Sequence, residues 1–346
     1  MQHIVRPSQG SEGMMKGLRT ALVFVFAFAF ALAFVAFSGC LENSPEGAGR
    51  NGPGMEDMSI VDLKAQSVRS ADDLNSYSLK SSVAENVKIG AVSVNLTPKH
   101  HGMSKRILQV SRNASERKES TETVAQLNLS GYQASSRSTT VKMYREGQGA
   151  EQSRTGHTEI YQAGNSTHIR QDNGSWINII APVSIEAFWS RDSSNPAKGL
   201  AEMVNRSQAE IVGIESLDGT DAFKLKIVSE GSEYSDLYYE AIVLANEMAG
   251  YPAVMPSINR TEFDETAVID KTAWISKETN LPLKYQTRVG FKVTAHIIGV
   301  LDAETRLMKM LNQSVPLGEI SVEFETSEVY YDFNRSIQVD LPEEAF

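Results

Sequence analysis

Cys40 is the only cysteine in the chain, and its position limits the chemistry that its thiol can do. It ends the run Thr20–Cys40, which contains no Asp, Glu, Lys or Arg and follows two basic residues. A basic start, an apolar stretch and small residues before a cleavage point are typical of a secretory signal. We therefore predict that residues 1–39 are a signal peptide, that cleavage follows Gly39, and that Cys40 is a lipid attachment point.

The residues around the predicted cleavage point resemble the lipobox of membrane-anchored lipoproteins. Ser38 and Gly39 are the small residues of that pattern, whereas Phe37 stands where Leu, Val or Ile is usual. The alternative is an uncleaved transmembrane anchor, because a helix over residues 21–37 would be roughly 25 Å long. That length is at the short edge of what spans a bilayer. Both interpretations tether the remaining chain outside the cytoplasm.

Other reactive side chains form no recognisable catalytic or metal-binding motif. HExxH, GxSxG, Walker, GxGxxG and EF-hand patterns are all missing from the sequence. The adjacent pair His100 and His101 would point in opposite directions on a strand, which makes a poor chelate. His157 and Glu159 are expected to be a solvated pair on one strand face. We predict no cofactor, no metal and no catalytic residue, with scattered carboxylates as the remaining route to an enzyme.

The charge of the chain excludes some partners. It carries 33 Lys and Arg against 43 Asp and Glu, a net charge of −10. Removing residues 1–39 would leave about −12. Such a chain is not expected to bind nucleic acid, which requires basic patches. Electrostatic adhesion to anionic lipids is disfavoured for the same reason.

Asparagines in Asn-X-Ser/Thr sequons are unusually frequent. Nine of the seventeen asparagines have this pattern, where roughly three are expected by chance. We predict N-glycosylation at some of them, which agrees with export. A lipobox combined with many sequons suits an archaeal surface protein better than a typical bacterial one. The candidates are Asn95, Asn113, Asn128, Asn165, Asn173, Asn205, Asn259, Asn312 and Asn334.

The chain divides into a leader, a tether and one domain. Residues 1–39 form the leader, and Met14 is an alternative start within it. Residues 40–57 are rich in Gly, Pro and Asn and are expected to form a flexible tether. Residues 58–346 are predicted to form a single domain, whose core must be stabilised by burial because disulfides are excluded.

Hydrophobic periodicity predicts a strand-rich domain with a few helices. Helices are expected at residues 59–74, 185–206 (broken near Asn195-Pro196), 235–248 and 303–311. Strands are expected around residues 92–97, 125–130, 141–143, 211–217, 223–228, 266–275 and 283–294. Asp218-Gly219-Thr220-Asp221 is typical of a hairpin turn. The apolar phase changes between Phe324 and Val329, which predicts a β-bulge near residues 326–327.

Three short runs carry a family resemblance. They are the hairpin residues 161–176, the segment WISKETNLPLK at 274–284, and the closing strand that begins at Tyr331-Asp332-Phe333-Asn334 and ends at residue 345. All three are similar to lipoprotein carriers of the LolA type and their LppX/LprG-like lipoprotein relatives. The resemblance covers residues 58–346 in layout and only these runs in detail.

The resemblance implies an α+β fold in which helices close a curved antiparallel β-sheet, a half-open β-barrel, around an apolar cavity. It also implies a membrane-anchored, extracytoplasmic lipoprotein that binds or carries a hydrophobic ligand, such as a lipid or lipoprotein acyl chains, without catalysis. The alternative is a cell-surface interaction or sensor module that uses the same fold with a fully packed core. A solute-binding protein would need two α/β lobes, which the strand-rich pattern does not indicate. The sequence does not identify ligand-binding residues.

Overall fold

The structure is a computed structural model, and it describes residues 59–96, 108–191, 194–250, 254–301, 307–340 and 342. The predicted signal peptide, its cleavage residue Gly39, the lipidation residue Cys40 and the tether lie outside the described residues.

A capped helix starts the described chain. α2 (Ile60–Asp72) begins at the N-cap Ser59, whose hydroxyl accepts a hydrogen bond of 3.1 Å from the backbone N–H of Asp62. This contact satisfies one of the donors that a helix N-terminus leaves unpaired. Leu63 and Ala71 form its buried face. The predicted first helix is confirmed.

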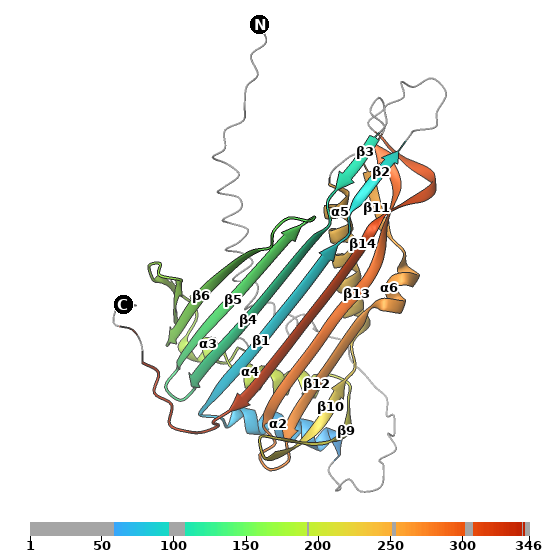
Figure 1. Cartoon of the computed structure of the whole chain (residues 1–346). Coiled ribbons are helices and arrows are strands. Elements are labelled where there is room, and N and C mark those ends of the chain that lie inside the picture. Colours follow the sequence, from blue (N-terminus) through green and yellow to red (C-terminus); the bar gives the residue numbers. More distant parts are fainter. Residues whose placement is uncertain are drawn as a thin grey trace, which may run out of the picture.

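One antiparallel sheet of twelve strands dominates the fold (Figure 1). Its strands follow the order β8-β7-β6-β5-β4-β1-β14-β13-β12-β10-β9. β11 lies outside this order and pairs with β13 further along that strand than β12 does. A separate two-stranded sheet contains β2 (Val92–Leu96) and β3 (Leu108–Arg112). The strands of the large sheet are β1 (Ser76–Ile89), β4 (Ser115–Asn128), β5 (Gln133–Glu146), β6 (Gln152–Ala163), β7 (Ser166–Gln171), β8 (Ile177–Ile180), β9 (Ala209–Leu217), β10 (Thr220–Ile227), β11 (Val254–Ile258), β12 (Val268–Ser276), β13 (Pro282–Leu301) and β14 (Met308–Tyr331).

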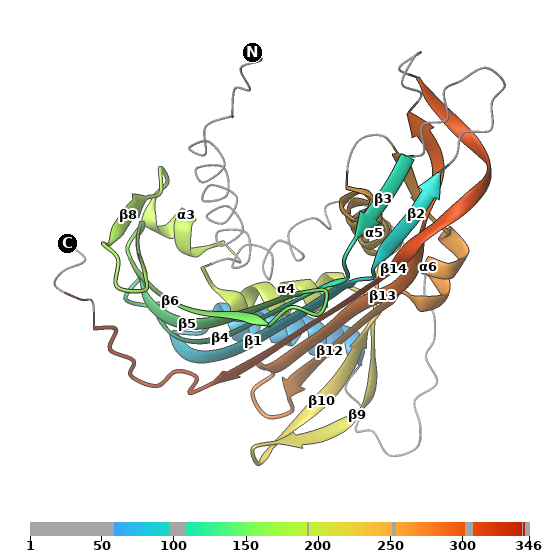
Figure 2. The same ribbon diagram turned by 45° about the horizontal axis from the view of Figure 1, so that its top comes forward.

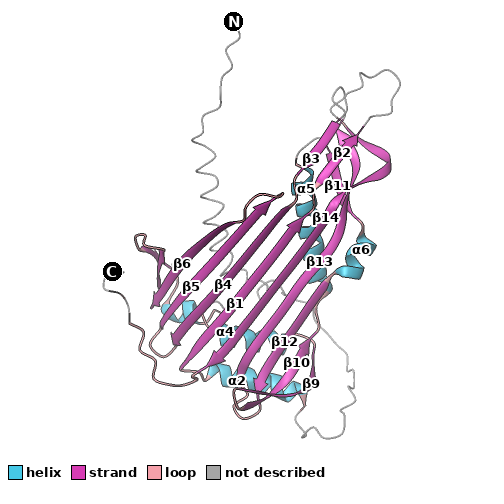
Figure 3. Ribbon diagram, viewed as in Figure 1, coloured by secondary structure: helices cyan, strands magenta, loops and turns pink. Residues whose placement is uncertain are grey.

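The sheet bends into a trough, and α3, α4 and α5 lie on its concave side (Figure 2). Figure 3 shows how few helices accompany the long strands. Besides α2, the helices are α3 (Ile185–Trp189), α4 (Pro196–Arg206), α5 (Gly231–Ala249) and α6 (Arg260–Thr266). The predicted α+β fold, a curved antiparallel sheet with helices on its inner side, is confirmed.

Glycine and strand irregularities contribute to the bend. A Cβ atom at Gly290 in β13 would lie 2.6 Å from the carbonyl oxygen of Val322 in β14, so only glycine lets these strands approach. The β13–β14 register also shifts between Ala295 and His296, and again between Ile297 and Gly299. Such bulges increase local twist and curvature.

Two apolar clusters fill the two ends of the concave side. The cluster at the lower end of the sheet in Figure 1, the lower cluster, joins α2, α3 and α4 to β1, β4, β10 and β12. It includes Tyr77, Trp189 and Leu225. The upper cluster joins α5 and α6 to β13 and β14, and includes Met248 and Phe291. Five of the buried residues in the lower cluster are aromatic, whereas the upper cluster is mostly aliphatic. Burial of this apolar surface stabilises both clusters.

Two predictions about the C-terminal third are wrong. Residues 308–311 of the helix predicted at 303–311 belong to β14, and residues 302–306 lie outside the described residues. The bulge predicted near residues 326–327 is absent, because β14 pairs with β1 in continuous register from Ile320 to Tyr331. The apolar residues Val329 and Tyr331 therefore stay on the convex face, where the ammonium of Lys80 lies 5.5 Å from the ring centre of Tyr331.

Two local signals in the sequence are confirmed. The break between α3 and α4 falls at Asn195-Pro196, where the Asn195 side chain caps α4. The turn between β9 and β10 contains Asp218 and Gly219, both with positive φ. Positive φ at both central residues is the conformation that two-residue hairpin turns require.

Candidate functional site

Two rows rich in small hydroxyl side chains cross the concave face between the apolar clusters. Directly paired residues on neighbouring strands point to the same face of a sheet, so the strand register identifies the residues of each row. One row runs through Tyr285, Glu328, Ser81, Thr123, Ser138 and Thr158. The adjacent row runs through Lys271, Thr287, Thr326, Val83, Thr121 and Thr140.

Hydrogen bonds join hydroxyls within these rows. The Oγ1 atoms of Thr121 and Thr140 lie 2.9 Å apart, and Thr123 Oγ1 lies 2.8 Å from Ser138 Oγ. Thr123 and Thr140 are buried. The pairing gives these hydroxyls hydrogen-bond partners on a face that becomes apolar toward the lower cluster.

Charged side chains form the next row toward the upper end. Glu85, Glu119, Lys142 and Arg154 are cross-strand neighbours on β1, β4, β5 and β6. Lys142 Nζ lies 2.8 Å from Glu119 Oε2, and Arg117 Nη2 lies 2.7 Å from Glu85 Oε1. On β4 to β6 the concave face therefore changes from apolar through hydroxyl to charged along the strands.

Glu328 is an acidic residue on the inner face of β14. The hydroxyl of Tyr330 donates to its Oε2 at 2.5 Å. Burial raises the pKa of the Glu328 carboxyl, and the hydrogen bond from Tyr330 opposes that shift. Burial likewise raises the pKa values of Tyr285 and Tyr330. These groups favour their neutral forms.

A nearly buried ion pair fixes the start of α5 on the sheet. Lys271 of β12 pairs with Glu233 of α5, and their side chains are only 13% and 14% exposed. Glu233 also accepts a hydrogen bond from the backbone N–H of Glu230, which completes the N-terminal cap of the helix. α5 is thus held at one end of the polar rows by charge and by its cap.

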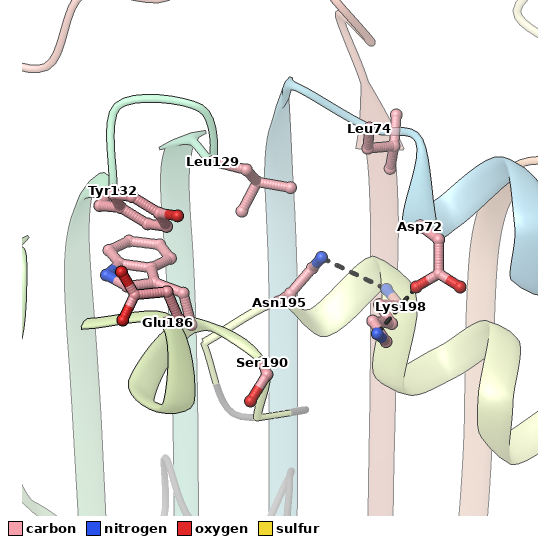
Figure 4. Close-up of a pocket in the computed structure, with 9 residues that line it drawn as sticks. Asp72, Leu74, Leu129, Tyr132, Glu186, Ser190, Asn195 and Lys198 are labelled. Carbon is pink, nitrogen blue, oxygen red and sulfur yellow. Dashed lines mark hydrogen bonds and ion pairs between the residues drawn. The ribbon is translucent and has the colours of Figure 1, made fainter. Parts of the chain in front are cut away.

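Two hollows lie at opposite ends of β1 and β4. A hollow of about 390 Å³ beside Ile89 and Ser115 has charged walls that include Glu116 and Arg145. A pocket of about 230 Å³ lies at the other end, and we call it the aromatic pocket (Figure 4). Its walls include Asp72, Tyr132, Glu186, Trp189, Asn195 and Lys198.

Six of the predicted glycosylation residues have exposed side chains. These are Asn113, Asn173, Asn205, Asn259, Asn312 and Asn334. Asn95 lies on β2. Asn165 differs, because its amide Nδ2 donates to the carbonyls of both Ala181 and Val183 at 3.1 Å. Asn128 Nδ2 donates to the carbonyl of Ile337 at 3.2 Å.

The described residues contain no group of three or more His, Cys, Asp or Glu side chains placed to hold a metal ion. His157 Nδ1 lies 3.2 Å from the hydroxyl of Thr139, and His100 and His101 lie outside the described residues. Within the described part of the chain, no helix has the length and apolarity needed to cross a membrane.

The sequence analysis did not predict the two hydroxyl-rich rows or the acidic residue Glu328 within them. A signal for the rows exists, because Thr121 and Thr123 continue the alternation of Ala125 and Leu127 on β4. No comparable local signal marks Glu328, since its neighbours on the inner face come from distant strands.

Comparison with known proteins gives only distant likenesses. No family model matches the sequence, and a search of curated proteins found no match. Solved structures with a similar chain path include lipoprotein LppX of Mycobacterium tuberculosis (12% identity, TM-score 0.32, 82% of this chain and 100% of that one). LprF of Mycobacterium bovis is 12% identical, with a TM-score of 0.30 over 83% of this chain and 97% of that one. A DUF1329 family protein of Desulfovibrio piger is 10% identical, with a TM-score of 0.21 over 81% and 93%.

Proposed function

We propose that this chain is a membrane-anchored, extracytoplasmic lipoprotein that binds an amphipathic, hydrophobic ligand on its concave face and performs no catalysis. The observation that carries the proposal is the polarity gradient along β4, β5 and β6. Leu127 and Ala134 lie at the apolar end, Thr123 and Ser138 in the middle, and Glu119 at the charged end. A lipid has the same order of groups along its length, from acyl chain to polar head.

The gradient also gives the ligand an orientation. Acyl carbons lie toward the lower apolar cluster, because removing apolar surface from water is favourable there. The polar head lies over the hydroxyl and charged rows, where buried polar groups of a ligand find hydrogen-bond partners. A ligand with acyl chains alone would leave these rows without new partners.

Anchoring and export belong to the same proposal. A diacyl or diether lipid on Cys40 would supply the two chains that stable anchoring requires. The 17 residues from Leu41 to Asp57 then limit how far the domain reaches, to about 60 Å at full extension. We further propose glycosylation first at the six sequon asparagines with exposed side chains; a mass shift on enzymatic or chemical deglycosylation tests this.

Native mass spectrometry of the full chain, extracted from its membrane in mild detergent, tests ligand binding. We expect a co-purified amphipathic lipid. Replacing Thr123→Val together with Ser138→Ala removes one hydroxyl pair while keeping side-chain size, and should reduce occupancy by lipids with hydroxyl-rich heads. Thr139→Val is the matched control, since Thr139 lies on the convex face of the same strand. Repeated absence of any lipid, or equal occupancy in all three proteins, would contradict the proposal.

A second candidate is a cell-surface interaction or sensor module. Two observations favour it: aromatic side chains pack into the lower apolar cluster, and the edge strand β8 exposes Ile177, Ile179 and Ile180. Exposed apolar edge strands are sites where another chain can pair. This candidate would be supported over the lipid-carrier function if the protein purified without lipid and if Ile179→Lys abolished binding of a partner protein.

A further inference from the structure

A strained tyrosine forms one wall of the aromatic pocket. Tyr132 has φ of 51°, in the left-handed region that bulky residues rarely adopt. Glycine would adopt this conformation in the β4–β5 turn without strain. Such strain persists where surrounding structure enforces it, and it is concentrated at binding sites.

A chain of hydrogen bonds holds this tyrosine against a tryptophan. The carbonyl of Tyr132 accepts a hydrogen bond of 2.9 Å from the N–H of Gly164. The carbonyl of Gly164 in turn accepts one of 2.6 Å from the indole Nε1–H of Trp189. The two rings lie 6.2 Å apart between centres, at an angle of 50°. Tyr132 is 37% exposed and Trp189 only 6%, so the tyrosine presents most of the accessible aromatic surface.

The opposite wall offers hydrogen-bond donors and acceptors. Asn195 is 7% exposed, and its Oδ1 accepts hydrogen bonds from the Tyr77 hydroxyl and the backbone N–H of Lys198. Those two contacts fix the amide, and no acceptor among the described residues pairs with its Nδ2 donor. Lys198 Nζ pairs with Asp72 Oδ1 at 2.7 Å, and the exposed carboxylate of Glu186 stands nearer Tyr132 (Figure 4).

We propose that the aromatic pocket binds a neutral saccharide unit. A sugar ring has apolar C–H faces that pack on an aromatic ring, and hydroxyls that both donate and accept hydrogen bonds. Asn195 Nδ2 serves as donor to a sugar oxygen, and the Glu186 and Asp72 carboxylates serve as acceptors. The two carboxylates disfavour a phosphate or other anion. A volume of about 230 Å³ suits one ring rather than an oligosaccharide.

The saccharide can come from a free sugar or from the head of a glycolipid. The site does not depend on lipid binding to the concave face, because its walls come from the turns and helix ends at the lower end of the sheet. Free sugar binding without co-purified lipid would therefore support this inference while the carrier function fails.

Saturation-transfer NMR with the full chain in detergent tests the site. The probes are methyl glycosides of glucose, mannose and N-acetylglucosamine, and a glycolipid in mixed micelles. We expect saturation to be transferred from the protein to at least one glycoside if the ligand is a free sugar. If the ligand is a glycolipid, we expect transfer to the glycolipid head alone. Tyr132→Gly removes the ring and relieves the strained φ, so the fold is retained, and we expect binding about tenfold weaker.

Asn195→Asp provides a second, conservative variant. It keeps an oxygen for the Tyr77 hydroxyl and for the cap of α4 but removes the Nδ2 donor, and should also weaken binding. Tyr239→Ala is the control, because Tyr239 is an exposed tyrosine on α5 and no part of the pocket. No saturation transfer to any sugar probe, or equal transfer in wild type and both pocket variants, would overturn the proposal.

Discussion

The carboxylate of Glu328 accepts a 2.5 Å hydrogen bond from Tyr330, two residues further along the same face of β14. Both side chains lie on the concave side, where Tyr77 and Tyr285 surround them. Because burial raises the pKa of the Glu328 carboxyl, the folded protein binds its proton more tightly than the unfolded chain does.

Stability should therefore fall with rising pH through the titration of Glu328. The sign follows because the native state holds more protons than the unfolded state between the unfolded and folded pKa values. Glu328→Gln, which is neutral at every pH and still accepts from Tyr330, should unfold at a higher temperature than wild type at pH 8 and show a smaller decrease between pH 5 and pH 8. Calorimetry of both proteins measures their unfolding temperatures. If these changed with pH in parallel, the pH dependence would not come from Glu328.

Gly290→Ala should destabilise the sheet where β13 approaches β14. The new Cβ atom would lie 2.6 Å from the carbonyl oxygen of Val322, and backbone cannot move aside as a flexible side chain does. We expect a loss of about 2–3 kcal/mol in the free energy of unfolding, measured by denaturant titration. Gly213→Ala is the control, since a Cβ at Gly213 would meet nothing within 4 Å. Equal effects of the two changes would contradict this account of the bend.

Asn165→Asp should destabilise the turn between β6 and β7. The amide Nδ2 of Asn165 donates to the carbonyls of Ala181 and Val183, and a carboxylate would face both oxygens without a proton to share. We expect a loss of about 3 kcal/mol at neutral pH, again by denaturant titration. Asn173→Asp in the next turn has an exposed side chain and should change stability little. If Asn165→Asp unfolded at the same denaturant concentration as wild type, these hydrogen bonds would contribute nothing to the free energy of unfolding.

Cys40→Ser should release the chain from the membrane fraction. Serine cannot form the thioether that a lipoprotein anchor uses, so the variant should lose the lipid mass and appear in the soluble fraction. Intact-mass spectrometry and fractionation measure both changes. Wild-type protein that keeps residues 1–39 and carries no lipid mass would instead identify an uncleaved anchor.

Local features of the fold were predictable because each depends on a few neighbouring residues. Ser59 and Asp62 determine where α2 begins, and Asn195-Pro196 separates α3 from α4. Asp218-Gly219 likewise determines a hairpin turn through backbone preferences alone. None of these requires knowledge of which strands pair.

The candidate site was not predictable, because it exists only across strands. Ser81 and Glu328 are neighbours on the concave face although they come from opposite ends of the domain sequence. The apolar residues Val329 and Tyr331 suggested a change of face, yet both remain on the convex side, where the ammonium of Lys80 covers Tyr331. Trp274 is a similar case, buried on the convex side beneath Lys224 and Lys284.

The order of the sheet has a mechanical consequence. A closed barrel has a circumference fixed by its strand number and shear. Here the described sheet ends at β8 on one side and β9 on the other, so its perimeter is not fixed by hydrogen bonds. Hinging at the register shifts of β13 and β14, between Ala295 and His296 and between Ile297 and Gly299, would widen or narrow the trough while the regular ladders stay intact. If the chain carries ligands as proposed, ligands of different width could occupy the same trough without any strand leaving its partner.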